Sequence, residues 1–111
     1  MLRSKIHRAT VTGADVNYEG SISIDTELMA RADIVEWEQV AVLDVDNGAR
    51  FETYVMAGGA GEIRVNGAAA RLVDPGHRVI ILTYTDLDDE ERERSGFAPT
   101  VVLVDRANRA R

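Results

Sequence analysis

The residues of this 111-residue chain that could do chemistry lie in a few short segments. Lys5 and His7 are two positions apart and Arg50 and Tyr54 are four apart, so each pair shares one face if its segment is a β-strand. The planar guanidinium of Arg50 can bind both oxygens of a carboxylate at once. Arg50 is therefore suited to hold the carboxylate of a small substrate.

Each of the strand residues also has an ordinary structural explanation. Arg50 could be an exposed hairpin arginine paired with Glu52 or Asp44, an ion pair that would contribute little to stability. Thr53 suits a strand because its side chain is β-branched, and Tyr54 suits one as a half-buried tyrosine. Because adjacent strand residues face opposite sides, Thr53 and Tyr54 can reach one site only if the strand twists, bulges or ends there.

Two glycine-containing turns complete the candidate set. Gly20-Ser21 is by itself only a turn dipeptide. The segment Asn66-Gly67-Ala68-Ala69 could present backbone N–H groups to a ligand with no side chains in the way, or it could be a tight turn with a small-residue packing contact. The local sequence leaves both alternatives open.

The sequence indicates no metal or phosphate site. His7 and His77 lack companions at the spacing of metal ligands, and the chain has no cysteine. The glycine-rich segment 58–61 is not followed by Lys-Ser or Lys-Thr, so it lacks the signature of a phosphate-binding loop. The acidic run 86–91 lacks the spacing of a calcium loop, and we expect a solvated helix start or loop there.

Composition and charge narrow the function classes. Apolar residues make up 45% of the chain, which predicts one folded domain with one core. A net charge of −6 argues against nucleic acid as a partner, and we expect the short basic segment 106–111 to be a frayed terminus. The longest apolar run, residues 79–82, is too short to span a bilayer, and residues 1–8 lack the apolar region of a secretory signal. We therefore expect a cytoplasmic protein with no membrane partner.

The elements that must position the candidate residues are mostly strands. Asn47-Gly48 between two β-prone runs predicts a hairpin, and Asp25 or Thr26 is expected to cap a short helix over residues 27–32. The predicted strands are short: 6–12, 40–45, 50–55, 63–65, 78–84 and 100–105. Many short strands with few helices indicate a small closed barrel.

Three ordered blocks of the sequence resemble those of the pyruvoyl-dependent aspartate decarboxylase family. The blocks are Lys5-Ile6-His7-Arg8 with Thr12, Asp15, Tyr18-Glu19-Gly20-Ser21 and Ile24-Asp25; then residues 47–54; then residues 65–70. The resemblance covers roughly residues 1 to 105, and ordered blocks are far more specific than one short motif. Two departures stand out: segment 58–62 is shorter and richer in glycine than is usual, and Arg71 stands where a histidine is common.

The resemblance implies that the chain cleaves itself between Gly20 and Ser21, into residues 1–20 and 21–111. The Ser21 hydroxyl would attack the Gly20 carbonyl, and elimination and hydrolysis would leave a pyruvoyl group as the cofactor. Loss of CO2 from an amino acid leaves a carbanion, and a Schiff base to that carbonyl would accept its electrons. Glycine before the serine suits this chemistry because it can adopt strained geometry.

The resemblance also implies roles for the other candidates. Tyr54 would donate a proton to the carbanion, and Thr53 would polarise the scissile carbonyl and contact the substrate. Arg50 and Lys5 are the cations expected near the two carboxylates of L-aspartate. We hypothesise that Arg50 holds the side-chain carboxylate, because a strong cation on the departing carboxylate would oppose its loss. The remaining residues of the implied site support it or contact the substrate: His7, Asn66, Gly67, Ala68 and Ala69.

The implied fold is mainly β, a single six-stranded double-psi β-barrel with short helices over residues 1–111. The implied function is conversion of L-aspartate to β-alanine and CO2 for pantothenate and coenzyme A synthesis. A homotetramer with active sites at subunit interfaces and, as in some relatives, a maturation factor are the implied partners. Three alternatives stay open: an uncleaved, non-catalytic barrel that acts as a binding module, a DNA-binding regulator, which the net charge disfavours, and another small amino acid as substrate.

Overall fold

Strands dominate the computed structural model, which describes all of residues 1–111. In chain order the strands are β1 Leu2–Thr10, β2 Gly13–Asp15, β3 Ser21–Asp25, β4 Gln39–Asp44, β5 Arg50–Gly58, β6 Ile63–Asn66, β7 Arg78–Tyr84 and β8 Thr100–Leu103. The helices are α1 Thr26–Ala32, the 3-10 helix η1 Gly67–Leu72 and α2 Asp89–Ser95. The predicted mainly β class with short helices is confirmed.

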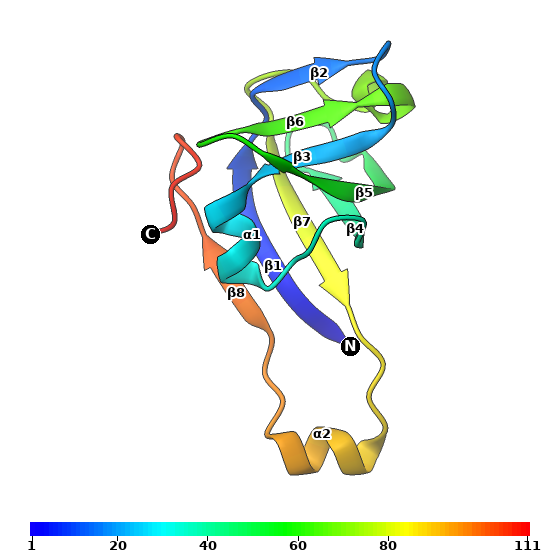
Figure 1. Cartoon of the computed structure of the whole chain (residues 1–111), viewed down its shortest axis with the longest axis vertical. Coiled ribbons are helices and arrows are strands. Elements are labelled where there is room, and N and C mark those ends of the chain that lie inside the picture. Colours follow the sequence, from blue (N-terminus) through cyan, green and yellow to red (C-terminus); the bar gives the residue numbers. More distant parts are fainter.

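All eight strands belong to one sheet, in the order β2-β6-β3-β5-β4-β7-β1-β8 (Figure 1). β5 joins its two halves, because its first residues pair antiparallel with β4 and its last pair parallel with β3. Parallel pairs also join β1 to β8 and β2 to β6. There are eight strands where six were expected, and the short β2 and β8 lie at the two edges. The arrangement is consistent with a small β-barrel.

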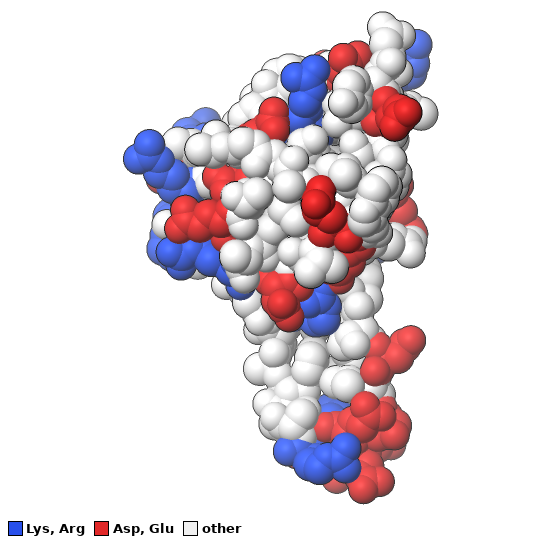
Figure 2. All heavy atoms as spheres, in the orientation of Figure 1, with Lys and Arg blue, Asp and Glu red and all other residues white.

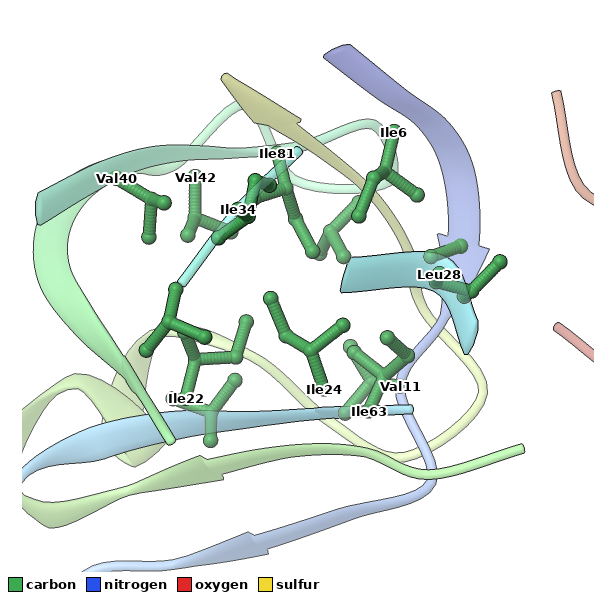
Figure 3. Close-up of a cluster of buried hydrophobic side chains, with 14 of the residues drawn as sticks. Ile6, Val11, Ile22, Ile24, Leu28, Ile34, Val40, Val42, Ile63 and Ile81 are labelled. Atoms are coloured by element: carbon green, nitrogen blue, oxygen red, sulfur yellow. The ribbon is translucent and has the colours of Figure 1, made fainter. Parts of the chain in front are cut away.

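The hydrophobic core lies between the strands, as Figure 3 shows. Ile22 and Ile24 of β3 are fully buried in it, and Leu28 of α1 packs into the same cluster. Because side chains alternate along a strand, Ser21 and Ser23 lie on the opposite face of β3. Burial of one such isoleucine is worth about 1.5–3 kcal/mol. The core therefore determines which face of β3 the two serines occupy.

The hairpin between β4 and β5 forms as predicted. Asp44 Oδ1 accepts hydrogen bonds from the backbone N–H groups of Asp46 and Asn47, at 2.8 and 3.2 Å. Gly48 adopts a φ of +76°, which few other residues tolerate. β4 and β5 then pair without a register shift as far as Tyr54. Side chains on this part of β5 consequently alternate regularly between the two faces.

The two α-helices are short and are capped by aspartates. Asp25 Oδ1 accepts from the Glu27 backbone N–H at 2.7 Å, as the sequence predicts, and Asp88 Oδ1 accepts from that of Glu91 at 2.7 Å. α2 has no buried residue and lies apart from the rest of the chain, at the bottom of Figures 1 and 2. No helix is both long enough and apolar enough to cross a bilayer.

The C-terminal segment is ordered, so the prediction that it frays was wrong. Asn108 is buried, with a φ of +62°. Its side-chain amide donates to the carbonyl oxygens of Thr10 and Gly61 at 2.8 and 2.9 Å, and accepts from the Thr10 N–H at 2.6 Å. These hydrogen bonds hold the tail against the barrel. A single polar residue of this kind has no hydrophobic signature, so composition gave no sign of it.

A partly buried ionic contact joins the turn before β7 to the end of β4. His77 Nδ1 lies 2.7 Å from Oδ2 of Asp44, whose side chain is fully buried. This hydrogen bond is the main cause of a raised pKa at His77, and the negative charges of Asp44, Asp46 and Asp74 add to it while desolvation opposes it. The contact therefore strengthens when the imidazole is protonated.

We expect the contact between Asp44 and His77 to stabilise the fold more at low pH. The folded-state pKa of His77 is raised, so its stabilisation is complete below the unfolded-state pKa and is lost as the pH rises through the folded-state pKa. A double-mutant cycle with Asp44→Asn and His77→Gln isolates the pairwise coupling. Urea unfolding at about pH 5.5 and about pH 8.5 should give the larger coupling at the lower pH. Equal couplings would show that His77 does not titrate against Asp44.

Candidate active site

Ser21 opens β3 on the face opposite the core. It is 4% exposed, and its Oγ accepts a hydrogen bond from Asn66 Nδ2 at 3.1 Å. Ser21 and Asn66 are also paired in the ladder between β3 and β6. Arg64 Nε donates to Asn66 Oδ1 at 3.2 Å, at the other end of the same amide. Asn66 is thus oriented by Arg64 and in turn holds the Ser21 hydroxyl.

Gly67 lies directly against the peptide that precedes Ser21. It has a φ of +79°, and a Cβ at this position would lie 2.6 Å from Gly20 Cα and 2.9 Å from Gly20 N. Glycine is therefore required for both its backbone conformation and its lack of a side chain. The predicted turn after Asn66 is the start of η1. Its first residue packs on Gly20.

A cavity of about 260 Å³ opens beside Ser21. Tyr54 and Met56 reach it because they alternate along β5 with the core residue Val55. The wall is formed by β3 and the segment before it, by β5, and by the loop before β4: Tyr18, Glu19, Ser21, Ser23, Trp37, Tyr54, Met56 and Ala57. The predicted nucleophile Ser21 and the predicted proton donor Tyr54 therefore line one cavity, and its wall contains no Lys or Arg.

Trp37 is a residue of this wall that sequence analysis missed. Its ring stacks on that of Tyr54, with centroids 5.4 Å apart and planes inclined by 18°. Trp37 has a φ of +73°, a left-handed conformation that costs about 1–2 kcal/mol for a residue with a side chain. The only signal in the sequence is the position of the chain's single tryptophan. It stands between Glu36 and Glu38, outside the alternating pattern of any predicted strand.

Within one chain, none of the six predicted substrate contacts lines this cavity: Thr53, Gly67, Ala68, Ala69, Arg50 and Lys5. Thr53 is half-buried and pairs with Val40 of β4, on the side of β5 opposite Tyr54, and no register shift moves it. Ala68 is exposed and Ala69 packs against the core. The predicted site residues that the structure brings together are Gly20, Ser21, Tyr54, Asn66 and Gly67.

Arg50 lines a separate cleft of about 320 Å³. Its Nη2 donates to Tyr84 Oη at 3.4 Å. It forms no ion pair with Glu52 or Asp44. Glu52 accepts a hydrogen bond from Gln39, and Asp44 binds His77. Arg50 and Tyr54 share a face of β5 as expected, but four residues of extended strand separate their Cα atoms by about 13 Å.

Lys5 and His7 share the outward face of β1, as expected, in another part of the sheet. Three strands, β5, β4 and β7, lie between β3 and β1 in the strand order. His7 Nδ1 is buried without a hydrogen-bond partner. Burial lowers the pKa of His7, and the positive charges of Lys5, Arg8 and Arg78 lower it further. Within one chain, neither Lys5 nor His7 lines the Ser21 cavity.

Comparison with known proteins identifies the family. The family model described as aspartate decarboxylase matches residues 1–111. The chain is 56% identical over 110 residues to an aspartate 1-decarboxylase from Clostridium botulinum (strain 657 / Type Ba4), and 54% identical over 110 residues to one from Clostridium kluyveri (strain ATCC 8527 / DSM 555 / NBRC 12016 / NCIMB 10680 / K1). Each match covers 97% of this chain and 85% of the relative. The chain belongs to the aspartate decarboxylase family.

Membership of the aspartate decarboxylase family confirms the resemblance carried by the three sequence blocks. The family is one of enzymes, and this weighs against a DNA-binding regulator. Ser21, Asn66 and Gly67 all come from blocks that carry the resemblance, and the fold brings them into contact. The Ser21 cavity is therefore the candidate active site of this aspartate decarboxylase family member.

We expect Gly67→Ala to destabilise the uncleaved chain through its contact with Gly20. Ser21→Ala provides an uncleavable background, and Gly48→Ala is the matched control. Both glycines have positive φ, +79° and +76°, but a Cβ at Gly48 meets nothing within 4 Å. The control should lose about 1–2 kcal/mol of unfolding free energy, and Gly67→Ala at least about 1 kcal/mol more. Equal losses in urea unfolding would contradict the close contact between Gly67 and Gly20.

Proposed function

We propose that this chain decarboxylates L-aspartate to β-alanine and CO2 with a pyruvoyl group made from Ser21. The observation that carries the proposal is the buried Ser21 hydroxyl, which Asn66 holds beside a cavity whose wall contains Tyr54. The substrate follows from the family, in which both relatives described above are named aspartate 1-decarboxylase.

Maturation begins with the Ser21 hydroxyl. Its oxygen attacks the Gly20 carbonyl carbon, the C–N bond between the two residues breaks, and the hydroxyl proton passes to the released amine, which leaves an ester. Loss of the Ser21 Cα proton then breaks the Cβ–O bond, so that Gly20 leaves as a carboxylate and position 21 becomes dehydroalanine. Tautomerisation and addition of water release ammonia and leave a pyruvoyl terminus. Asn66 supports the attack by orienting the hydroxyl, and Gly67 by limiting the movement of Gly20.

The surroundings of position 21 fit a pyruvoyl group, which accepts hydrogen bonds and donates none. In the uncleaved chain the Asn66 amide nitrogen donates to Ser21 Oγ. That oxygen leaves with Gly20, so after cleavage the same donor is free for the new carbonyl oxygen at position 21. Arg64 binds the other end of that amide and so keeps its nitrogen directed at position 21. When formed, the group would supply an electrophilic carbonyl that accepts the electron pair left by departing CO2.

Tyr54 is the proposed proton donor at this cavity. The other ionisable residues of the wall are Tyr18 and Glu19, which belong to the segment 1–20, and Tyr18 is 63% exposed. The phenol of Tyr54 is therefore the best-placed acid of the 21–111 segment to protonate the product carbon. The proposal does not depend on Thr53, which faces the other side of β5.

The cations that L-aspartate needs are proposed to come from a neighbouring copy in a homotetramer. The substrate carries two carboxylates, whereas the Ser21 cavity of one chain has no Lys or Arg in its wall. Arg50 and Lys5 lie elsewhere on the sheet, and neither forms an ion pair that would occupy it. We propose that they bind the carboxylates of a substrate in an adjoining subunit, with Arg50 on the side-chain carboxylate that remains in the product.

The product would supply pantothenate and coenzyme A synthesis, and we propose the cytoplasm as the location. Both statements follow from the family and its chemistry. A maturation factor would act before decarboxylation, since it would accelerate cleavage at Gly20–Ser21.

We expect intact mass spectrometry of the purified protein to show two fragments, residues 1–20 and 21–111. Ser21→Ala should remain one chain because it lacks the attacking oxygen. Asn66→Leu should cleave at least about tenfold more slowly, because it loses the hydrogen bond that orients Ser21. Ser95→Ala, at the exposed end of α2 and outside the cavity wall, is the control and should cleave at the wild-type rate. A wild-type chain that stays intact after prolonged warming would favour the non-catalytic binding module.

We expect two impaired variants to complement each other if one site uses residues from two copies. Tyr54→Phe removes the proton donor and should lower kcat by about 10²- to 10⁴-fold. Lys5→Ala should chiefly raise KM, because it removes a cation that binds the substrate. Mixed oligomers of the two variants contain some sites with both Lys5 and Tyr54, so co-expression should restore part of the β-alanine formation. If the mixed oligomers are cleaved but no more active than either variant alone, Lys5 and Tyr54 of one site come from the same chain.

A further inference from the structure

We propose that Trp37 is a positioning residue that holds the Tyr54 ring for proton transfer. The inference rests on the proposed function, because it takes Tyr54 as the proton donor. The two rings are stacked, with centroids 5.4 Å apart and planes inclined by 18°, and both line the Ser21 cavity. Trp37 would thus act on the reaction through Tyr54 and not through a group of its own.

The backbone around Trp37 is fastened to β5 beside Tyr54. The Trp37 N–H donates to the Val55 carbonyl at 2.7 Å, and the Val55 N–H donates to the Glu38 carbonyl at 3.0 Å. These two hydrogen bonds hold the loop before β4 against the strand that carries Tyr54. They maintain the φ of +73° at Trp37, in a region that bulky side chains rarely occupy. The indole therefore stacks on Tyr54 only because the Trp37 backbone adopts this unfavourable left-handed conformation.

Hydrophobic burial does not account for this arrangement. Within one chain Trp37 is 70% exposed, so packing inside the chain removes little of its apolar surface from water. The Tyr54 hydroxyl makes no hydrogen bond, and its cross-strand neighbour Gln39 donates its amide to Glu52 instead. Without the stack, the Tyr54 ring could exchange between rotamers and its hydroxyl would be less often in position to deliver a proton. A backbone outlier at a candidate site is the kind of feature that function accounts for better than stability.

Three substitutions separate the possible contributions of Trp37. Trp37→Phe keeps an aromatic face, Trp37→Leu keeps apolar volume without one, and Trp37→Asn removes the ring while tolerating the positive φ. In fully cleaved protein we expect Trp37→Phe to stay within about twofold of the wild-type kcat and the other two to lose about three- to tenfold, which is the range of aromatic pair energies. KM for L-aspartate should change by less than about twofold, because the lost contact is to Tyr54 and not to substrate.

Near-ultraviolet circular dichroism gives a readout that does not depend on activity. Trp37 is the only tryptophan, so the signal of the stacked pair can be assigned to it. The signal should be present in the wild type and in Tyr54→Phe, which keeps the ring, and absent in Trp37→Leu and Tyr54→Leu. Persistence of the signal in Tyr54→Leu would contradict the stack.

Two kinetic results would contradict a positioning role for Trp37. A wild-type kcat in Trp37→Leu and Trp37→Asn would overturn the inference. A raised KM at unchanged kcat would also overturn it, because Trp37 would then be a wall for substrate and not a support for Tyr54. If the wild-type protein forms no β-alanine, the proposed function fails, while the circular dichroism still decides whether Trp37 holds the Tyr54 ring.

Discussion

The close approach of Gly67 to Gly20 is the constraint on which the candidate site depends. The two residues meet backbone to backbone, so closely that a Cβ on Gly67 would lie 2.6 Å from Gly20 Cα. Because Gly67 directly follows β6, this contact sets the position of Asn66 against the start of β3. Ser21 is held there on the outer face, since its isoleucine neighbours occupy the core. One backbone contact and the packing of one strand together position the hydroxyl.

Charge is distributed so that one chain does not complete a site for a dicarboxylate. The Ser21 cavity combines a hydroxyl, aromatic rings and an acid, Glu19, but no cation. The cations suited to aspartate, Lys5 and Arg50, are displayed on other parts of the sheet. The proposed tetramer resolves this separation, because a second copy can supply what the cavity lacks. The division also explains why neither residue has an intramolecular carboxylate partner.

Features that depend on neighbours in the chain could be predicted from the sequence. The turn at Asn47-Gly48 and the Asp25 cap each have a local cause, and both form. The resemblance to the family predicted that the turn at Asn66 lies beside Ser21. No local signal in the sequence predicts that contact. Contacts between distant segments were missed: Asn108 orders the tail only because Thr10 and Gly61 lie beside it, and the Trp37 stack depends on how its loop bonds to β5. The resemblance implies one site for Thr53 and Tyr54, whereas the regular alternation of β5 directs their side chains to opposite faces within one chain.

We propose that position 21 becomes the group that binds aspartate. Borohydride reduction of the active protein in the presence of L-aspartate, followed by mass analysis of the 21–111 fragment, tests this directly. We expect a substrate- or product-derived amine to become fixed to the first residue of that fragment, and decarboxylation to be lost in proportion to the fraction modified. Ser21→Ala should show no such addition. If the protein still decarboxylates fully after reduction and the first residue of its 21–111 fragment is unmodified, position 21 does not bind aspartate.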